Sequence, residues 1–146
     1  MFSRAGDPIV PDDLDDVSTE VLAEEIQTLA GHIAAATCGF LVMLGEFDHR
    51  EAYERWECLS AAHWLNWRCG MSMTAAREQV RVARRLRELP VVLAAFSRGQ
   101  LSYSKVRAIA RVANDRTEAD LVSVAQHATT QQVEVACRAI RRSCVR

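Results

Sequence analysis

The chain has 146 residues, of which 49% are hydrophobic and 25% are charged, and its formal net charge at pH 7 is −1. This length suits one domain that hides about two thirds of its unfolded surface. The start carries no apolar run, and the longest apolar stretch, residues 38–44, is too short for a bilayer, so we expect neither a signal peptide nor a membrane partner. The five cysteines lack a Cys-x-x-Cys spacing, which favours reduced thiols in the cytoplasm over disulfides or redox catalysis.

An even spread of this small negative charge would argue against nucleic acid, because Lys and Arg supply most of the affinity for phosphates. Residues 1–60, however, hold three basic and thirteen acidic residues, a balance of −10, while residues 61–146 hold 15 basic and six acidic ones, a balance of +9. This division predicts an acidic arm joined to a body that binds a polyanion. Two solvated faces that attract each other would give the same division.

The first predicted segment, residues 1–17, is a flexible acidic leader. It contains two prolines, few large apolar residues, and aspartates at positions 12, 13, 15 and 16, a composition typical of unfolded chain. Ser18 is then a good helix N-cap. We expect residues 18–146 to form a single helical domain.

A long helix is predicted after Ser18, because apolar residues recur there at alternating spacings of four and three over about four heptads. These positions are Leu22, Ile26, Leu29, Ile33, Ala36, Phe40, Met43 and Phe47. Such a seam packs on a partner helix, which is either another part of this chain or a second copy in a homodimer. Gly31, Gly39 and Gly45 predict a kink or a close helix crossing within it.

Six short helices are predicted after this long one, since helix-starting and helix-ending residues become frequent. Their expected ranges are 60–69, 72–89, 90–98, 102–113, 117–128 and 129–142. The last begins with Thr129 and Gln132 at capping-box spacing. No stretch alternates with period two for long enough to be a strand, so the predicted fold class is all-α.

The first two of these short helices, 60–69 and 72–89, have the layout of a helix-turn-helix, with Gly70 in the turn and Ser72 as the N-cap of the second helix. Basic residues on that second helix and on the next helical hairpin are the candidate DNA contacts. They are Arg77, Arg81, Arg84 and Arg85, followed by Lys105, Arg107 and Arg111. Arginine on an exposed helix face matches phosphates and guanine edges. A solvated basic face paired with the acidic half is the alternative.

Other chemistry-bearing residues favour structural roles. Cys58, His63 and Cys69 lack the fourth ligand and the paired spacings of a zinc site. The three tryptophans, at 56, 64 and 67, have helical spacing and are expected in the core. The acidic residues from Glu46 to Glu57 are expected to lie at an acidic helix end and in the loop that follows it. We therefore expect no metal, no cofactor and no catalytic site.

Six stretches together resemble one protein family. They are residues 29–37, 45–51, 58–70, 75–84, 88–90 and 99–108. This combination is similar to domain of unknown function 222, found in mycobacterial thirteen-E-twelve repeat proteins and their actinobacterial relatives, which often carry an HNH endonuclease domain further along. Residues 61–113 are also similar to the helix-turn-helix region of chromosome-partition proteins.

The resemblance implies a helical module from a nuclease-associated, mobile-element context. An HNH site needs histidines and an Asn or Asp around a metal, and this sequence offers no such arrangement, so we expect a non-catalytic module that binds or positions double-stranded DNA. The chain ends where family members usually continue, which predicts a truncated relative or the first portion of a longer reading frame. The alternative is a protein-interaction domain without DNA binding, in which the seam from Leu22 to Phe47 forms a homodimer or docks a separately encoded nuclease partner, or a degenerate relative.

Overall fold

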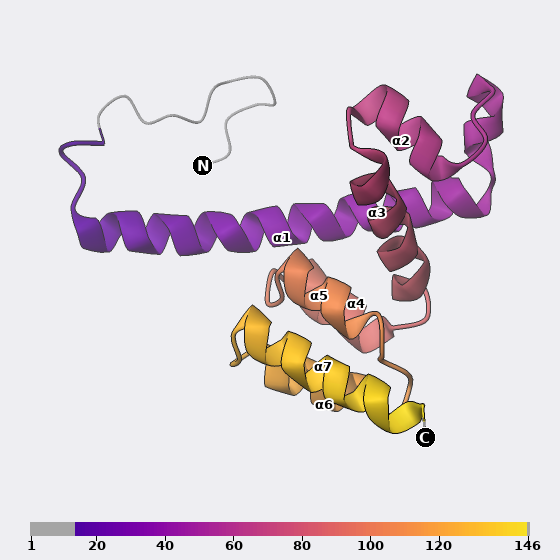
Figure 1. The fold of residues 1–146 in the computed structure, drawn as a ribbon. Coiled ribbons are helices and arrows are strands. Elements are labelled where there is room, and N and C mark those ends of the chain that lie inside the picture. The colour runs from indigo at the N-terminus through magenta and orange to yellow at the C-terminus, as the bar shows by residue number, and fades with distance from the viewer. Residues whose placement is uncertain (1–13, 146) are drawn as a thin grey trace.

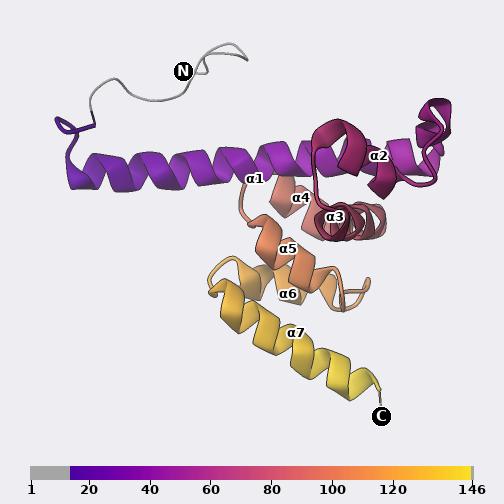
Figure 2. The ribbon, with the colours of Figure 1, turned by 45° about the horizontal axis from the view of Figure 1, so that its top comes forward.

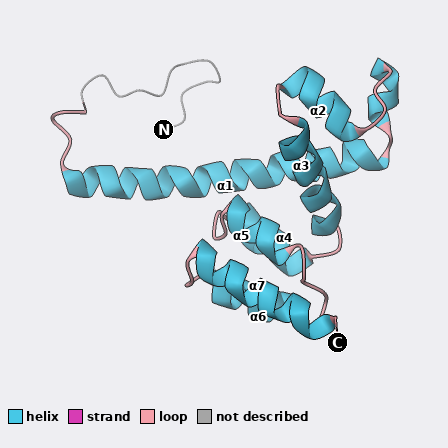
Figure 3. Cartoon of the chain, viewed as in Figure 1, coloured by secondary structure: helices cyan, strands magenta, loops and turns pink. Residues whose placement is uncertain are grey.

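A computed structural model describes residues 14–145, which form helices joined by loops and contain no strand (Figures 1 and 3). The helices are α1 (Thr19–His49), the 3-10 helix η1 (Ala52–Trp56), α2 (Ala61–Cys69), α3 (Met73–Leu86), α4 (Pro90–Ser97), α5 (Tyr103–Ile109), α6 (Glu118–Ala125) and α7 (Thr130–Cys144). The predicted all-α class is confirmed. The first thirteen residues of the predicted acidic leader lie outside the described part.

Local capping sets where most of these helices begin. The side chains of Ser18, Ser60, Ser72, Ser102 and Thr129 each accept a hydrogen bond from the backbone N–H three residues later. The Gln132 side chain completes the capping box of α7. The ends of α3, α5 and α6 come three or four residues earlier than the sequence predicted. At α3 the reason is a turn before Pro90, in which the Leu89 N–H donates to the Leu86 carbonyl.

The long helix α1 crosses one side of the molecule, and the other helices lie against its C-terminal part (Figures 1 and 2). α3 and α4 pack directly on α1, while α5, α6 and α7 continue the body away from it. The N-terminal part of α1 extends past the body, and all of its residues from 19 to 30 except Leu22 are exposed. α1 thus has a packed part and a projecting part.

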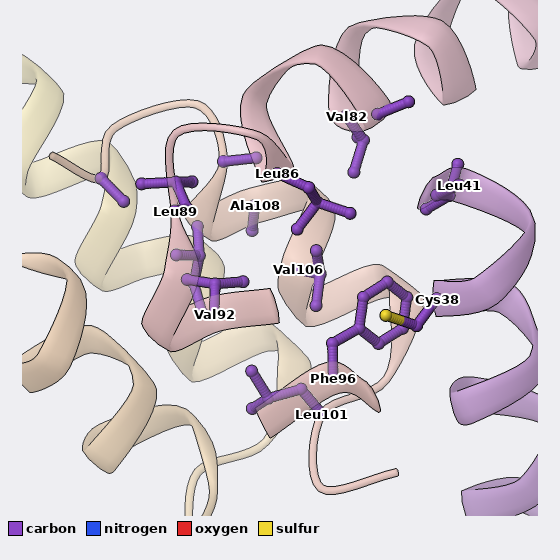
Figure 4. Close-up of a cluster of buried hydrophobic side chains, with 14 of the residues drawn as sticks. Cys38, Leu41, Val82, Leu86, Leu89, Val92, Phe96, Leu101, Val106 and Ala108 are labelled. Carbon is purple, nitrogen blue, oxygen red and sulfur yellow. The ribbon is translucent and has the colours of Figure 1, made fainter. Parts of the chain in front are cut away.

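The core lies where the packed part of α1 meets α3, α4 and α5. The buried residues of α1 are Ala34, Cys38, Leu41, Leu44 and Gly45. Figure 4 shows Cys38 and Leu41 facing a cluster that includes Val82 of α3 and Phe96 of α4. Most of these α1 residues are small, so the backbones approach closely and the larger side chains of α3 and α4 fill the space between them.

The predicted heptad seam is not the face that packs inside the domain. Ile26, Leu29, Ile33 and Met43 expose 66%, 44%, 59% and 68% of their surface, while only Phe40 and Phe47 pack against the core. The internal-partner interpretation of the seam is therefore wrong for most of its length. The buried face starts one position later, at Ala34, and successive helical residues are about 100° apart.

α1 is also long and apolar enough, by length and composition alone, to cross a membrane. No charged residue lies between Glu25 and Glu46. The expectation from residues 38–44 missed this, because it considered only consecutive apolar residues. Composition does not separate a membrane span from a helix that packs on protein, and one face of α1 is packed against α3 and α4.

Two glycines of α1 lie at close crossings, and the helix runs unbroken through them (Figure 1). A Cβ added to Gly45 would lie 3.3 Å from the Ala83 carbonyl oxygen. Gly99, in the turn between α4 and α5, has a φ of 73°, and a Cβ there would lie 2.5 Å from the Gly31 carbonyl oxygen. Gly39 has open space around it. The glycines therefore mark crossings rather than a kink.

Replacing Gly99 by alanine tests the second crossing. We expect Gly99→Ala to lower the free energy of unfolding by about 2–4 kcal/mol, because it adds a left-handed alanine and a clash with backbone. Gly39→Ala is the matched control and should be neutral or stabilising by up to about 1 kcal/mol. Urea unfolding followed by circular dichroism measures both. Equal effects of the two substitutions would contradict this account of the crossing.

Candidate nucleic-acid interface

The predicted helix-turn-helix elements are present as α2, a short turn and α3. Gly70 ends α2 with a φ of 68°, a left-handed conformation that glycine adopts without strain. The Asn66 amide donates to the Met71 carbonyl at 2.7 Å and holds the turn. A groove of about 450 Å³ lies between the start of α2 and one face of α3. Its lining residues are Ser60, Ala61, Ala62, Met73, Arg77, Val80, Arg81, Arg84 and Arg85.

Three arginines from two helices gather around Glu78 beside this groove. Arg81 of α3 donates to both carboxylate oxygens, and Arg107 and Arg111 of α5 each donate to Oε1 at 3.1 Å. The hydrogen bond from Arg81 and the nearby positive charges lower the pKa of Glu78 to about 2. One carboxylate thus serves three guanidinium groups, and the cluster keeps a positive surplus.

Arg77 is the predicted contact that stays free for a ligand. Its side chain is exposed at the groove, and within residues 14–145 it forms no hydrogen bond or ion pair. It lies one turn before Arg81 on the same face of α3. Arg77 therefore adds a fourth guanidinium next to the Glu78 cluster.

Arg84 joins the groove to the acidic end of α1. Its Nε and Nη2 donate to the two oxygens of Asp48 at 2.8 and 3.0 Å, a bidentate pair that raises the pKa of the Arg84 guanidinium. Arg87 pairs with Glu46 at 3.2 Å in the same region. The alternative prediction, a basic face paired with the acidic half of the chain, describes Arg84 and Arg87.

Arg85 and Lys105 point into the domain. Arg85 donates to the carbonyls of Ala110 and Ala113, and Lys105 donates to the Ala125 carbonyl at 2.7 Å. These carbonyls lie at or beyond the C-terminal ends of α5 and α6, where helices leave acceptors unpaired. Both side chains therefore connect helices, and we leave them out of the candidate surface.

The aromatic residues form a cluster at the end of α1, although not all of them are buried. The rings of Phe47 and Trp64 have centroids 4.5 Å apart, and Trp56 lies 6.1 Å from Phe47. Trp56 and Trp67 expose 42% and 54% of their surface, so the prediction of a core position is wrong for these two. η1 and α2 are too short to enclose them.

No metal site was found among residues 14–145, where His, Cys, Asp and Glu form no group of three or more that could hold an ion. Cys58 is buried, whereas Cys69 is exposed at the end of α2. His63 instead accepts a hydrogen bond from the Leu59 N–H at 3.2 Å. His63 therefore supports the loop before α2.

Sequence reasoning missed two acidic residues that organise this surface. Glu78 lies between Arg77 and Arg81 on α3, so its spacing indicated a local pair with Arg81. Its contacts with α5 depend on tertiary packing, which no local pattern shows. Asp48 was assigned only to an acidic helix end, yet it is the partner of Arg84.

A family described as "Domain of unknown function (DUF222)" matches residues 20–144. No curated protein sequence and no solved structure matches the chain. The match covers nearly all of the helices described above.

The Glu78 cluster predicts a particular pH dependence of stability. The folded-state pKa of about 2 lies below the ordinary value of 4.5, so the cluster stabilises the fold above pH 4.5 and loses this contribution as the pH falls toward 2. We expect Glu78→Gln to cost about 2 kcal/mol at pH 7, allowing for solvent around the arginines, and to flatten the profile below pH 4.5. Urea unfolding at several pH values measures both effects.

Glu134→Gln is the matched control, because Glu134 is exposed on α7 and belongs to no ion pair of the described residues. It should leave the stability at pH 7 within about 0.5 kcal/mol of the parent. If the Glu78 and Glu134 variants show the same profile, the cluster does not stabilise the fold.

Proposed function

The chain belongs to the DUF222 family, and we propose that it is a non-catalytic helical module that binds or positions double-stranded DNA through phosphate contacts. The observation that carries the proposal is the positive surplus beside the groove. Three guanidinium groups, those of Arg81, Arg107 and Arg111, share the single carboxylate of Glu78, and Arg77, unpaired among the described residues, lies on α3 beside them. Clustered arginines release counterions from DNA and give sequence-independent affinity.

The geometry favours phosphate contacts over reading of base edges. Arg81 and Arg84, two of the candidate DNA contacts on the helix expected to read bases, are held by Glu78 and Asp48. Base reading needs side chains that extend freely and form bidentate contacts. A phosphate contact does not require a fully extended side chain. A phosphate can approach Arg77 and the outer side of Arg107 and Arg111 while Glu78 stays in place.

The start of α2 supports the same surface. Ala61 and Ala62 form its first turn and line the groove opposite the arginines. Helix N-termini carry unpaired N–H groups and a partial positive charge that favour phosphates. A phosphate in the groove would therefore meet positive potential from both α2 and α3.

Removing two of the freer arginines tests this surface. We expect wild-type affinity for labelled duplex DNA to fall linearly on logarithmic axes as salt rises. Arg77→Ala with Arg111→Ala should weaken binding and reduce this slope by about 2, since each lost phosphate contact removes about 0.9. Fluorescence anisotropy across a salt series measures both quantities.

The control is Arg55→Ala with Arg98→Ala, which removes the same charge from η1 and from the end of α4, away from the groove. It should leave the slope unchanged. Absence of wild-type binding at low salt would refute the proposal, and an equal slope change in both double variants would refute the assigned surface.

We propose that this chain does not cut DNA by itself. The resemblance implies that longer relatives often carry an HNH nuclease. We expect supercoiled plasmid to remain intact with Mg²⁺, Mn²⁺ or Zn²⁺ at concentrations where the chain binds it. Gel electrophoresis of the plasmid checks this. Metal-dependent cleavage that co-purifies with the protein and disappears in an Arg77→Ala, Arg111→Ala variant would contradict the non-catalytic assignment.

The cysteines of the chain favour a cytoplasmic location. Exposed Cys69 and Cys144 are free thiols, and none of the five cysteines forms a disulfide. Such usage is typical of a reducing compartment. We assign the module to the cytoplasm, where DNA is accessible, as part of the same proposal.

A further inference from the structure

An apolar face of α1 is left largely uncovered by the fold, although Phe40 at its edge also packs against the core, and we name this face the α1 stripe. It consists of the seam positions Leu22, Ile26, Leu29, Ile33, Ala36, Phe40 and Met43. Ile26, Ile33 and Met43 each expose more than half of their surface. A row of mostly large apolar side chains at heptad spacing over three heptads is typical of a helix that packs on another helix.

The length of the α1 stripe indicates which helix covers it. A partner that follows the stripe from Leu22 to Met43 must continue for about six turns. Within residues 14–145, α1 has 31 residues, whereas α7 and α3, the next longest helices, have 15 and 14. α3 and α7 are also packed within the body. The helix in this chain that has the required length is therefore α1 of a second copy.

We propose that two copies of this chain associate through their α1 stripes, with the two helices antiparallel. The seam spacing of 4, 3, 4, 3, 4, 3 and 4 reads the same from either end. Antiparallel pairing centred between Ile33 and Ala36 therefore places every seam residue opposite a seam residue. Ile26 lies opposite Met43 of the second copy, and Leu29 lies opposite Phe40.

Charge favours the antiparallel arrangement over the parallel one. Asp15, Asp16, Glu20, Glu24 and Glu25 lie at or near the start of α1, and this helix contains no Lys or Arg. A parallel pair would bring the two acidic ends together, and like charges side by side destabilise. An antiparallel pair separates them and places each beside the other end of α1, where neighbouring arginines already pair with Glu46 and Asp48. It also aligns the helix dipoles favourably.

The shape of the molecule also suits this pairing. The body covers α1 from about Gly31 onward, and the earlier residues project (Figure 1). In an antiparallel pair, the projecting part of each α1 lies beside the packed part of the other. The seam ends at Phe47, whose ring contacts Trp56 and Trp64. This half-exposed aromatic cluster extends the apolar surface that meets Leu22 of the second copy.

The first test is the oligomeric state of the full chain, measured by sedimentation equilibrium from micromolar to submillimolar concentration. We expect a concentration-dependent dimer. Ile26→Glu should be monomeric with unchanged helicity and thermal stability, because residue 26 is exposed in the single copy. Val135→Glu on α7 is the control, since Val135 is 54% exposed and lies off the stripe. It should dimerise as wild type does.

Orientation is tested by mixing two variants. Ile26→Glu and Met43→Lys should each be monomeric alone. An antiparallel pair places the new Glu and Lys opposite each other and leaves Met43 facing Ile26, so the mixture should form a heterodimer. A parallel pair would place each charge opposite an apolar residue, and the mixture would stay monomeric. Recovery of dimer on mixing therefore supports antiparallel pairing, and failure to recover overturns it.

Three other results would overturn the proposal as a whole. These are a wild-type monomer at every concentration, a dimer that survives Ile26→Glu, and loss of dimer in the Val135 control. A monomer that floats with phosphatidylglycerol vesicles would instead identify a lipid surface as the occupant of the stripe. The inference does not depend on DNA, because the α1 stripe and the arginine groove share no residue and Arg77→Ala with Arg111→Ala should leave the dimer intact.

Discussion

The close packing of α1 on α3 and α4 is the constraint on which the rest of the structure depends. This face of α1 carries small residues, Ala34, Cys38 and Gly45, so the backbones of neighbouring helices approach it closely. The contact fixes the direction of α3 and hence of its arginine face. It also leaves the opposite side of α1 uncovered, so the groove and the exposed stripe both follow from one choice of buried face.

The uneven distribution of charge along the chain contributes both to ion pairs within the fold and to the candidate interface. Part of the negative half neutralises part of the positive half, since Asp48 pairs with Arg84 and Glu46 with Arg87. The positive surplus that remains lies around Glu78 and at Arg77. A surface of this kind has some arginines held for stability and others free for a ligand. Phosphate binding tolerates that division, whereas base-specific reading would not.

Local patterns predicted the helices well, because caps such as Ser60, Ser72 and Thr129 act within three residues of themselves. They failed to predict which face of α1 is buried. Both the Ile33 face and the Ala34 face have helical spacing, and hydrophobicity favoured the larger side chains. The structure buries the smaller ones. For the candidate site, the arginine row on α3 was visible in the sequence, while the sharing of Glu78 with α5 required the tertiary fold.

The two faces of α1 also argue for protein rather than lipid around it. A membrane span would need lipid on all sides of the uncharged stretch between Glu25 and Glu46. That would separate Cys38 and Leu41 from α3 and α4 and break the Asp48 pair with Arg84. A second helix needs only the outward face and leaves these contacts in place. Of a membrane span and the proposed helix pairing, the pairing is therefore the one that keeps the core intact and covers the stripe.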